Sequence, residues 1–295
     1  MLSYRHGYHA GNFADVLKHI ILVELLDYLT LKEKPFDYID SHAGAGWHKL
    51  NSEQANKTSE YTTGIGRLDA DDFPELEQYF SLLYPDRKTT GKVQKLSRYP
   101  GSPAIAKHYL RHRDRGWLFE IHPTDYAALH KLMAGDTQMR TFGEDGLQGM
   151  MGRLPPPSKR GLVLIDPSYE IKSDYQRVTE QLIKAYHKFA TGIYALWYPV
   201  VDRERINRLE RQLIGAGIRR MQLFELGLQS DTTERGMTSA GMIVIKPPRT
   251  LFNKMQPLLP KLAEKLAPET GVYRLEVLAG EDAAPPRPRQ RRNTR

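Results

Sequence analysis

The sequence predicts an α/β fold in which a mostly parallel sheet carries one reversed strand and a helical insertion. The first observation behind this prediction is that short apolar runs alternate with amphipathic patterns over residues 117–214, as in a sheet covered by helices on both faces. The second is that the last two apolar runs have no helical pattern between them, so we expect them to pair antiparallel.

The first predicted element is a helix that begins at Asn12 and ends at about Lys34. Asn12 can cap the helix, Asp15 follows three residues later, and apolar residues then recur at helical spacing. Residues 36–40 predict a short strand, which runs into a turn of small residues at positions 42–46.

The next predicted strand, at residues 117–121, begins about seventy residues after that turn, although a strand–helix–strand unit needs only about 30 residues. Between them, the apolar residues of segment 73–83 recur at helical spacing. We therefore expect a small helical insertion at about residues 50–97, inside a domain that spans residues 1–280.

Beyond the insertion, strands and helices alternate regularly. Strands are predicted at residues 117–121, 140–142, 161–165 and 192–197, and helices at residues 126–133, 146–153, 174–189 and 202–214. Strands at 221–226 and 241–245 follow, separated by a polar stretch. A parallel sheet that ends in one reversed strand fits the methyltransferase variant of the Rossmann architecture better than the dinucleotide-binding variant.

The composition of the 295 residues excludes several classes of protein. There is no cysteine, so disulfide scaffolds, cysteine nucleophiles, thiolate zinc sites and iron–sulfur clusters are excluded. No apolar run reaches the roughly 18 residues of a membrane span, and the N-terminus lacks the apolar core of a secretory signal. We expect a soluble, cytoplasmic protein. The net charge of +8 is compatible with a phosphate-rich partner, and the Pro/Arg-rich residues 281–295 are expected to be disordered.

Polar residues follow three successive predicted strands. The turn Asp40–Gly46 has the pattern D-x-x-x-G-x-G, which suits a nucleotide-binding loop but is equally compatible with an ordinary tight turn. Glu120 ends the second strand, where a carboxylate can bind ribose hydroxyls, and Asp145 with Gly146 follows the third, in place to contact an adenine edge. Together, these positions predict a site for an adenosyl cofactor.

The sequence Asp166-Pro167-Ser168-Tyr169 directly follows the apolar strand 161–165. Amino-methyltransferases of nucleic acids carry D/N/S-P-P-Y/F/W at this place, and Ser168 is the one departure. The Asp166 carboxylate and the Pro167 carbonyl can each accept a hydrogen of an adenine amine, and Asp166 can take up the released proton. Tyr169 offers a stacking face for the base. Because the second proline mainly stiffens the turn, we expect Ser168 to preserve activity.

Several blocks of the chain, which cover about residues 1–250, closely resemble the RlmJ family of bacterial large-subunit ribosomal RNA adenine-N6 methyltransferases. They are MLSYRH-x-x-HAGN-x-ADVLKH at the start, D-x-HAGAG at 40–46, YPGSP at 99–103, E-x-HP-x-DY at 120–126, D-P-x-Y at 166–169 and GIYALWYPVV at 192–201. The resemblance implies S-adenosylmethionine as methyl donor, an adenine in 23S ribosomal RNA as acceptor, a Rossmann-like methyltransferase fold with a helical insertion, and action as a monomer.

The same resemblance implies roles for individual residues. Asp166 would be the proton acceptor, and Tyr4 would contact the RNA from an N-terminal arm. The cofactor would be held by His19, His42, Ser102, Glu120, Asp145, Gly146 and Asp166. No metal is expected, since His6 and His9 lack further ligands nearby.

Two alternatives remain open at this point. The first is an adenine-N6 methyltransferase that acts on DNA, because the amine chemistry is the same. The second is a non-catalytic RNA-binding protein in which Ser168 marks lost activity.

Overall fold

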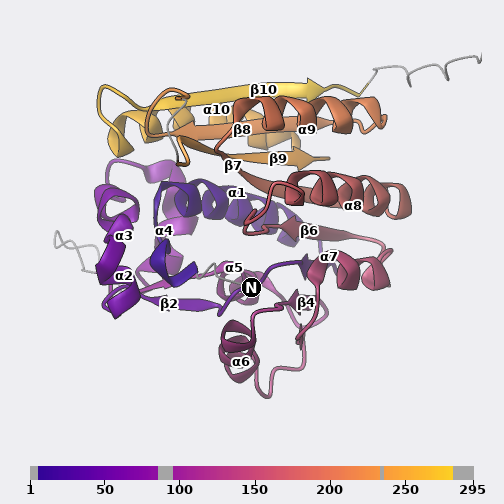
Figure 1. The fold of residues 1–295 in the computed structure, drawn as a ribbon. Helices are drawn as coiled ribbons and strands as arrows, with labels where there is room; N and C mark the ends of the chain where they lie inside the picture. The colour runs from indigo at the N-terminus through magenta and orange to yellow at the C-terminus, as the bar shows by residue number, and fades with distance from the viewer. Residues whose placement is uncertain (1–5, 86–95, 233–235, 282–295) are drawn as a thin grey trace, which may run out of the picture.

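The computed structural model describes residues 6–85, 96–232 and 236–281. Its centre is an eight-stranded sheet with the order β10-β8-β9-β7-β6-β1-β4-β5 (Figure 1). The strands are β1 (Asp37–Asp40), β4 (Arg115–Phe119), β5 (Met139–Phe142), β6 (Gly161–Ile165), β7 (Ile193–Val200), β8 (Met221–Gly227), β9 (Ser239–Ile245) and β10 (Val272–Ala279).

The sheet is parallel from β5 through β7, and its order reverses next to β1, which lies between β4 and β6. Strand β9 runs antiparallel to both β7 and β8, so the predicted reversed strand is confirmed. The structure adds a second reversed strand, because β10 pairs antiparallel with β8 at the edge of the sheet.

Helices cover both faces of the sheet. One face packs against α1 (Phe13–Thr30), α5 (Ser102–Tyr109) and α10 (Arg249–Leu266), and the other against α7 (Gly146–Gly149), the 3-10 helix η4 (Met150–Arg153), α8 (Asp174–Lys188) and α9 (Arg203–Gly215). In β6, Leu162 and Leu164 belong to the first core, whereas Val163 and Ile165 belong to the second. Alternate side chains of this strand are therefore buried on opposite faces, as its continuous apolar sequence predicts.

The helical insertion follows the first strand. Its elements are β2 (Trp47–Lys49), α2 (Glu53–Thr58), α3 (Glu60–Thr63), η2 (Ile65–Arg67), η3 (Pro74–Leu76), α4 (Glu77–Leu83) and β3 (Arg98–Pro100). Strands β2 and β3 pair antiparallel and close its base. Figure 1 shows α2, α3 and α4 gathered on one side of the molecule. Helix α6 (Pro123–Leu132) and the short η1 (His6–Tyr8) complete the described elements.

Some element boundaries differ from the predictions. Helix α1 ends at Thr30 instead of about Lys34, and β4 ends at Phe119, so Glu120 is the first residue beyond the strand. The predicted helix 146–153 is α7 followed by the 3-10 turn η4. The predicted tail from 281 onward lies outside the described residues except for Glu281. Of the helices in the described ranges, none is long and apolar enough to cross a lipid bilayer.

Candidate active site

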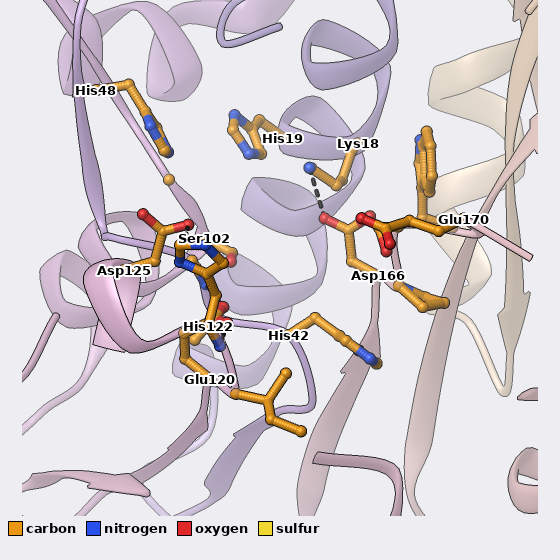
Figure 2. Close-up of a pocket in the computed structure, with 17 residues that line it drawn as sticks. Lys18, His19, His42, His48, Ser102, Glu120, His122, Asp125, Asp166 and Glu170 are labelled. Atoms are coloured by element: carbon orange, nitrogen blue, oxygen red, sulfur yellow. Dashed lines mark hydrogen bonds and ion pairs between the residues drawn. The ribbon is translucent and has the colours of Figure 1, made fainter. Parts of the chain in front are cut away.

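A pocket lies at the edge of the sheet where β1, β4 and β6 end. Because parallel strands point the same way, the residues that follow them meet at this edge. Helix α1 and the N-terminus of α5 form further parts of the wall (Figure 2). Six of the predicted site residues line this pocket: His19, His42, Ser102, Glu120, Asp166 and Pro167.

Asp166 is held by a buried lysine from the first helix. Lys18 Nζ lies 2.6 Å from Asp166 Oδ2 and 2.8 Å from Asp15 Oδ1. The side chain of Lys18 is only 5% exposed, and those of Asp15 and Asp166 are 2% and 13% exposed. Burial alone would lower the pKa of Lys18, but the two carboxylates outweigh it and hold that pKa above its usual value. Lys18 is therefore an ammonium ion that orients Asp166.

Tyr169 does not line the pocket. The centroid of its ring lies 4.4 Å from that of Tyr175 and 6.0 Å from that of Trp197. Its hydroxyl donates a hydrogen bond to the Trp197 carbonyl at 2.8 Å. Trp197 is the aromatic residue that lines the pocket at this position. Its indole Nε1 is buried and has no hydrogen-bond partner among the described residues.

Behind Ser102 lies a fully buried carboxylate at the end of β1. Asp40 Oδ2 accepts hydrogen bonds from Ser102 Oγ and Tyr38 Oη, both at 2.7 Å, and Asp40 Oδ1 accepts one from the backbone of His42 at 3.2 Å. Burial raises the pKa of Asp40 to about 6, although the hydrogen bonds from Ser102 and Tyr38 act in the opposite direction. The hydroxyl hydrogen of Ser102 is thus directed to Asp40, which leaves its oxygen lone pairs for the pocket.

Glu120 closes the turn that follows β1. Its two carboxylate oxygens accept hydrogen bonds from the backbone N–H groups of Gly44 at 2.8 Å and His122 at 2.7 Å. Burial raises the pKa of Glu120, and these two bonds partly oppose that rise. The bonds fix the orientation of the carboxylate, whose remaining lone pairs are suited to accept from vicinal hydroxyls.

Asp145 and Gly146 lie beside the pocket and do not line it. Asp145 caps α7 by accepting from Leu147 N at 3.0 Å, and its other oxygen pairs with Arg177 of α8. A Cβ at Gly146 would stand 1.7 Å from the carbonyl oxygen of Ser41, so only glycine permits this close approach of two loops. Both residues therefore shape this end of the site.

Two histidines are held by contacts with their neighbours. The ring of His19 stacks on that of Tyr99, with the ring centroids 5.3 Å apart, and His19 Nδ1 lies 3.1 Å from the Tyr99 hydroxyl. That hydroxyl lies 2.8 Å from the hydroxyl of Tyr79 in the insertion. His42 Nδ1 lies 2.7 Å from Ser41 Oγ. Burial lowers the pKa of His42 to about 4, so it is neutral at pH 7.

The sequence reasoning missed part of the pocket. Lys18, Trp197, Asp125 and Glu170 also line it, while the predicted arm residue Tyr4 lies outside the described residues. The sequence holds one local signal for Lys18, because Asp15 and Lys18 are opposite charges at i and i+3 in a mostly apolar helix. Among the described residues, no group of three histidine or acidic side chains could hold a metal ion.

Comparison with known proteins decides the family. A family model described as "Ribosomal RNA large subunit methyltransferase D, RlmJ" matches residues 33–279. The chain belongs to the RlmJ family. It is 48% identical over 270 residues to "Ribosomal RNA large subunit methyltransferase J" of Escherichia coli K12, covering 91% of this chain and 95% of that protein. It is 45% identical over 284 residues to the protein of the same name from Haemophilus influenzae, covering 95% and 100%.

Among solved structures, protein LPL1258 from Legionella pneumophila superposes on this RlmJ-family chain with a TM-score of 0.83. The two are 38% identical, and the match covers 93% of this chain and 99% of that one. Family membership makes the chain an S-adenosylmethionine-dependent methyltransferase, as the sequence predicted. Its Rossmann-like sheet with the reversed strand β9 agrees with that assignment.

The pocket of this RlmJ-family member fits S-adenosylmethionine. Four acidic side chains line it, namely Glu120, Asp125, Asp166 and Glu170, and they suit the ammonium and sulfonium charges of that molecule. Glu120 lines the pocket and is placed for the ribose hydroxyls.

Proposed function

We propose that this protein transfers the methyl group of S-adenosylmethionine to the exocyclic N6 of an adenine in 23S ribosomal RNA. The proposed enzyme acts in the cytoplasm as a monomer, and residues 1–280 form one methyltransferase domain around the insertion. The observation that carries the proposal is the placement of Asp166 and Pro167 on the wall of the same pocket as Glu120, Ser102 and His19.

The chemistry follows from the groups on that wall. S-adenosylmethionine supplies an electrophilic methyl group on a positively charged sulfur. The Asp166 carboxylate and the Pro167 carbonyl each accept one hydrogen of the adenine amine, which turns its nitrogen lone pair away from the base plane. Lys18 orients the Asp166 carboxylate through its 2.6 Å contact with Oδ2, and this carboxylate takes up the proton that the amine releases.

Aromatic residues beside the motif support an extruded base. Trp197 lines the pocket and offers its ring as a stacking face, and the ring of Tyr169 packs against it with the ring centroids 6.0 Å apart. Stacking of a base on an aromatic ring contributes about 1–3 kcal/mol. This contribution offsets much of the few kcal/mol that unstacking the adenine costs.

The names of the relatives favour RNA over DNA, since both are ribosomal RNA methyltransferases. The non-catalytic alternative is disfavoured because the acceptor Asp166 and the acidic pocket are both in place.

The test is methyl transfer from labelled S-adenosylmethionine to 23S ribosomal RNA from cells that lack this gene, with an adenine-containing DNA duplex as the second substrate. Asp166→Ala should abolish transfer and largely spare RNA affinity, whereas Glu180→Ala, an exposed site on α8 with the same charge change, should be active. Undiminished turnover of Asp166→Ala, transfer to DNA only, or no calorimetric binding of S-adenosylmethionine would each contradict the proposal.

A further inference from the structure

Three large apolar side chains are exposed in the segments that follow β4, β6 and β7. Ile121 is 47% exposed, Ile171 61% and Val201 52%. Because these strands run parallel, the three residues lie toward the edge of the sheet that holds the pocket. Ile121 lines the pocket, and Ile171 directly follows Glu170, which lines it as well (Figure 2). Apolar side chains gathered at the mouth of a pocket indicate a surface that a binding partner covers.

The backbone holds Ile171 in its exposed position. The N–H of Ile171 donates to Asp174 Oδ2 at 3.1 Å, and its carbonyl accepts from the N–H of Asp174 at 3.0 Å. The next residue, Tyr175, donates from its hydroxyl to the carbonyl of Pro199 at 3.0 Å, which ties this turn to the end of β7. The turn therefore presents the side chain of Ile171 to solvent at a fixed place beside the pocket.

Val201 is held in a similar way at the end of β7. The carbonyl of Val200 accepts from the N–H of Thr238 at 3.0 Å, and Asp202 caps α9 by accepting from the N–H of Glu204 at 3.1 Å. Hydrogen bonds on both sides of Val201 thus fix its backbone while its side chain stays exposed.

The two apolar side chains flank one groove between α8 and α9. Lys172 and Asp202 both line this groove, and they are the residues that directly follow Ile171 and Val201. The groove begins beside the pocket, because Glu170 and Lys172 stand on either side of Ile171 in the chain. A strand that enters the pocket can therefore continue over Ile171 into the groove.

The acids of this groove are paired, whereas Lys172 is not. Asp202 Oδ2 lies 2.8 Å from Arg205 Nε, and Glu204 Oε1 lies 2.6 Å from Arg211. Lys172 is exposed, and its side chain makes no hydrogen bond or ion pair with any residue that the structure describes. An ammonium group next to an exposed isoleucine is complementary to a strand that presents phosphates and bases together. Unpaired RNA is such a strand.

We propose that Ile171 packs against the base next to the target adenine and that Lys172 contacts a phosphate of the same RNA strand. The proposal rests on the proposed function, because it requires an adenine to be drawn out of an RNA strand. Extrusion leaves one face of the neighbouring base without its stacking partner. Apolar side chains that insert at such a step take the place of the missing base. Ile171 has the chemistry and the position for this, one residue from the pocket wall.

The experiment is a protein–RNA double-mutant cycle on a fragment of 23S ribosomal RNA that carries the methylated adenine. Ile171→Ala is combined with an abasic nucleotide on the 5′ or the 3′ side of that adenine, and kcat/KM is measured. With the intact fragment, we expect Ile171→Ala to lower kcat/KM about tenfold. With one of the two abasic fragments, Ile171→Ala should cost nothing further, because both changes remove the same contact.

Two further variants frame that result. Ile171→Met keeps an apolar side chain and should stay near the wild type. Ile214→Ala is the matched control, because Ile214 is 42% exposed and lies in the last turn of α9, the end of that helix away from Val201. It should not change kcat/KM.

Lys172→Gln tests the phosphate contact through its salt dependence. Loss of one contact to a single strand should reduce the log–log slope of RNA affinity against salt by about 0.7 in magnitude. Lys184→Gln, at an exposed lysine further along α8, should leave the slope unchanged. An unchanged slope in Lys172→Gln would overturn the phosphate contact.

The contact with the base is overturned if Ile171→Ala is additive with both abasic changes, or if it behaves like Ile214→Ala, as it would if a protein partner covered this surface. It is also overturned if Ile171→Ala weakens the calorimetric affinity for S-adenosylmethionine, because the residue would then act on the pocket itself. Failure of the proposed function has a different signature, since the wild-type protein would then methylate no 23S fragment.

Discussion

Replacing Lys18 by methionine tests the electrostatic centre of the site. Lys18 Nζ lies 2.8 Å from Asp15 and 2.6 Å from Asp166, and its side chain is 5% exposed. Methionine preserves most of the volume and removes the charge, so two nearly buried carboxylates lose their common counter-ion. Removing one partner of a buried ion pair typically costs about 3–5 kcal/mol. Because two acids share this lysine, we expect Lys18→Met to lower the free energy of unfolding by an amount in that range.

The measurement is equilibrium urea unfolding at pH 7 and pH 5, with Lys57→Met as the control at an exposed lysine. The pKa of Lys18 is raised, so in the wild type its stabilisation is fully present below pH 10 and does not change between pH 5 and 7. In the variant, the uncompensated carboxylates favour protonation in the folded state. The folded state of the variant then binds more protons than its unfolded state. The deficit, which is the loss in unfolding free energy caused by Lys18→Met, should therefore shrink as the pH falls.

A deficit below about 1 kcal/mol relative to Lys57→Met would refute this reasoning, because exposed ion pairs contribute no more than that. A deficit that stays constant or grows from pH 7 to pH 5 would refute the assignment of the carboxylates as its source.

Three further predictions concern the rest of the site. Gly146→Ala should sharply weaken binding of S-adenosylmethionine in calorimetry, because its Cβ would meet the Ser41 carbonyl at 1.7 Å, whereas Gly152→Ala, with nothing within 4 Å, should bind normally. The pKa of Asp40 is raised by burial from 3.8 to about 6, so its contribution to stability should decline by on the order of 3 kcal/mol as the pH rises from about 4 to 6. In urea unfolding measured across this pH range, Asp40→Asn should not show this decline in the free energy of unfolding. A decline as large as that of the wild type would refute the assignment to Asp40. RNA affinity should fall with salt, with a log–log slope of about −2 or steeper in filter binding if three or more phosphates are contacted; a flat response would exclude those contacts.

Most of the fold could be predicted because its signals are local. The apolar run 161–165 is buried on both faces, and its sequence shows that directly. Helix α10 was not predicted, because Pro257 and Pro260 lie inside it and proline usually excludes a helix interior. Strand β10 was missed as well. It is an edge strand with exposed residues such as Tyr273 and Val277, so its sequence lacks the apolar run of a buried strand.

The site was predictable where it depends on strand ends and unpredictable where it depends on packing. Glu120 and Asp166 follow parallel strands, so the topology alone brings them to one edge. Lys18 reaches Asp166 across 148 residues of sequence, and no local pattern indicates that contact. In the same way, Trp197 lines the pocket where Tyr169 was predicted to do so, and this depends on how β7 lies beside the motif loop.

Ser168 can be understood from what holds the ends of its loop. In the usual motif a second proline stiffens this turn. Here Asp166 is fixed at one end by Lys18 at 2.6 Å, and Tyr169 is fixed at the other by its 2.8 Å hydrogen bond to the Trp197 carbonyl. Tyr169 also adopts a φ of 51°, a left-handed conformation that a side chain enters only when its surroundings impose it. These contacts on both sides therefore set the path of the backbone, so the residue at position 168 does not have to stiffen the turn. We therefore expect serine at position 168 to preserve activity, because the contacts of Asp166 with Lys18 and of Tyr169 with Trp197 can supply the rigidity that a second proline would give.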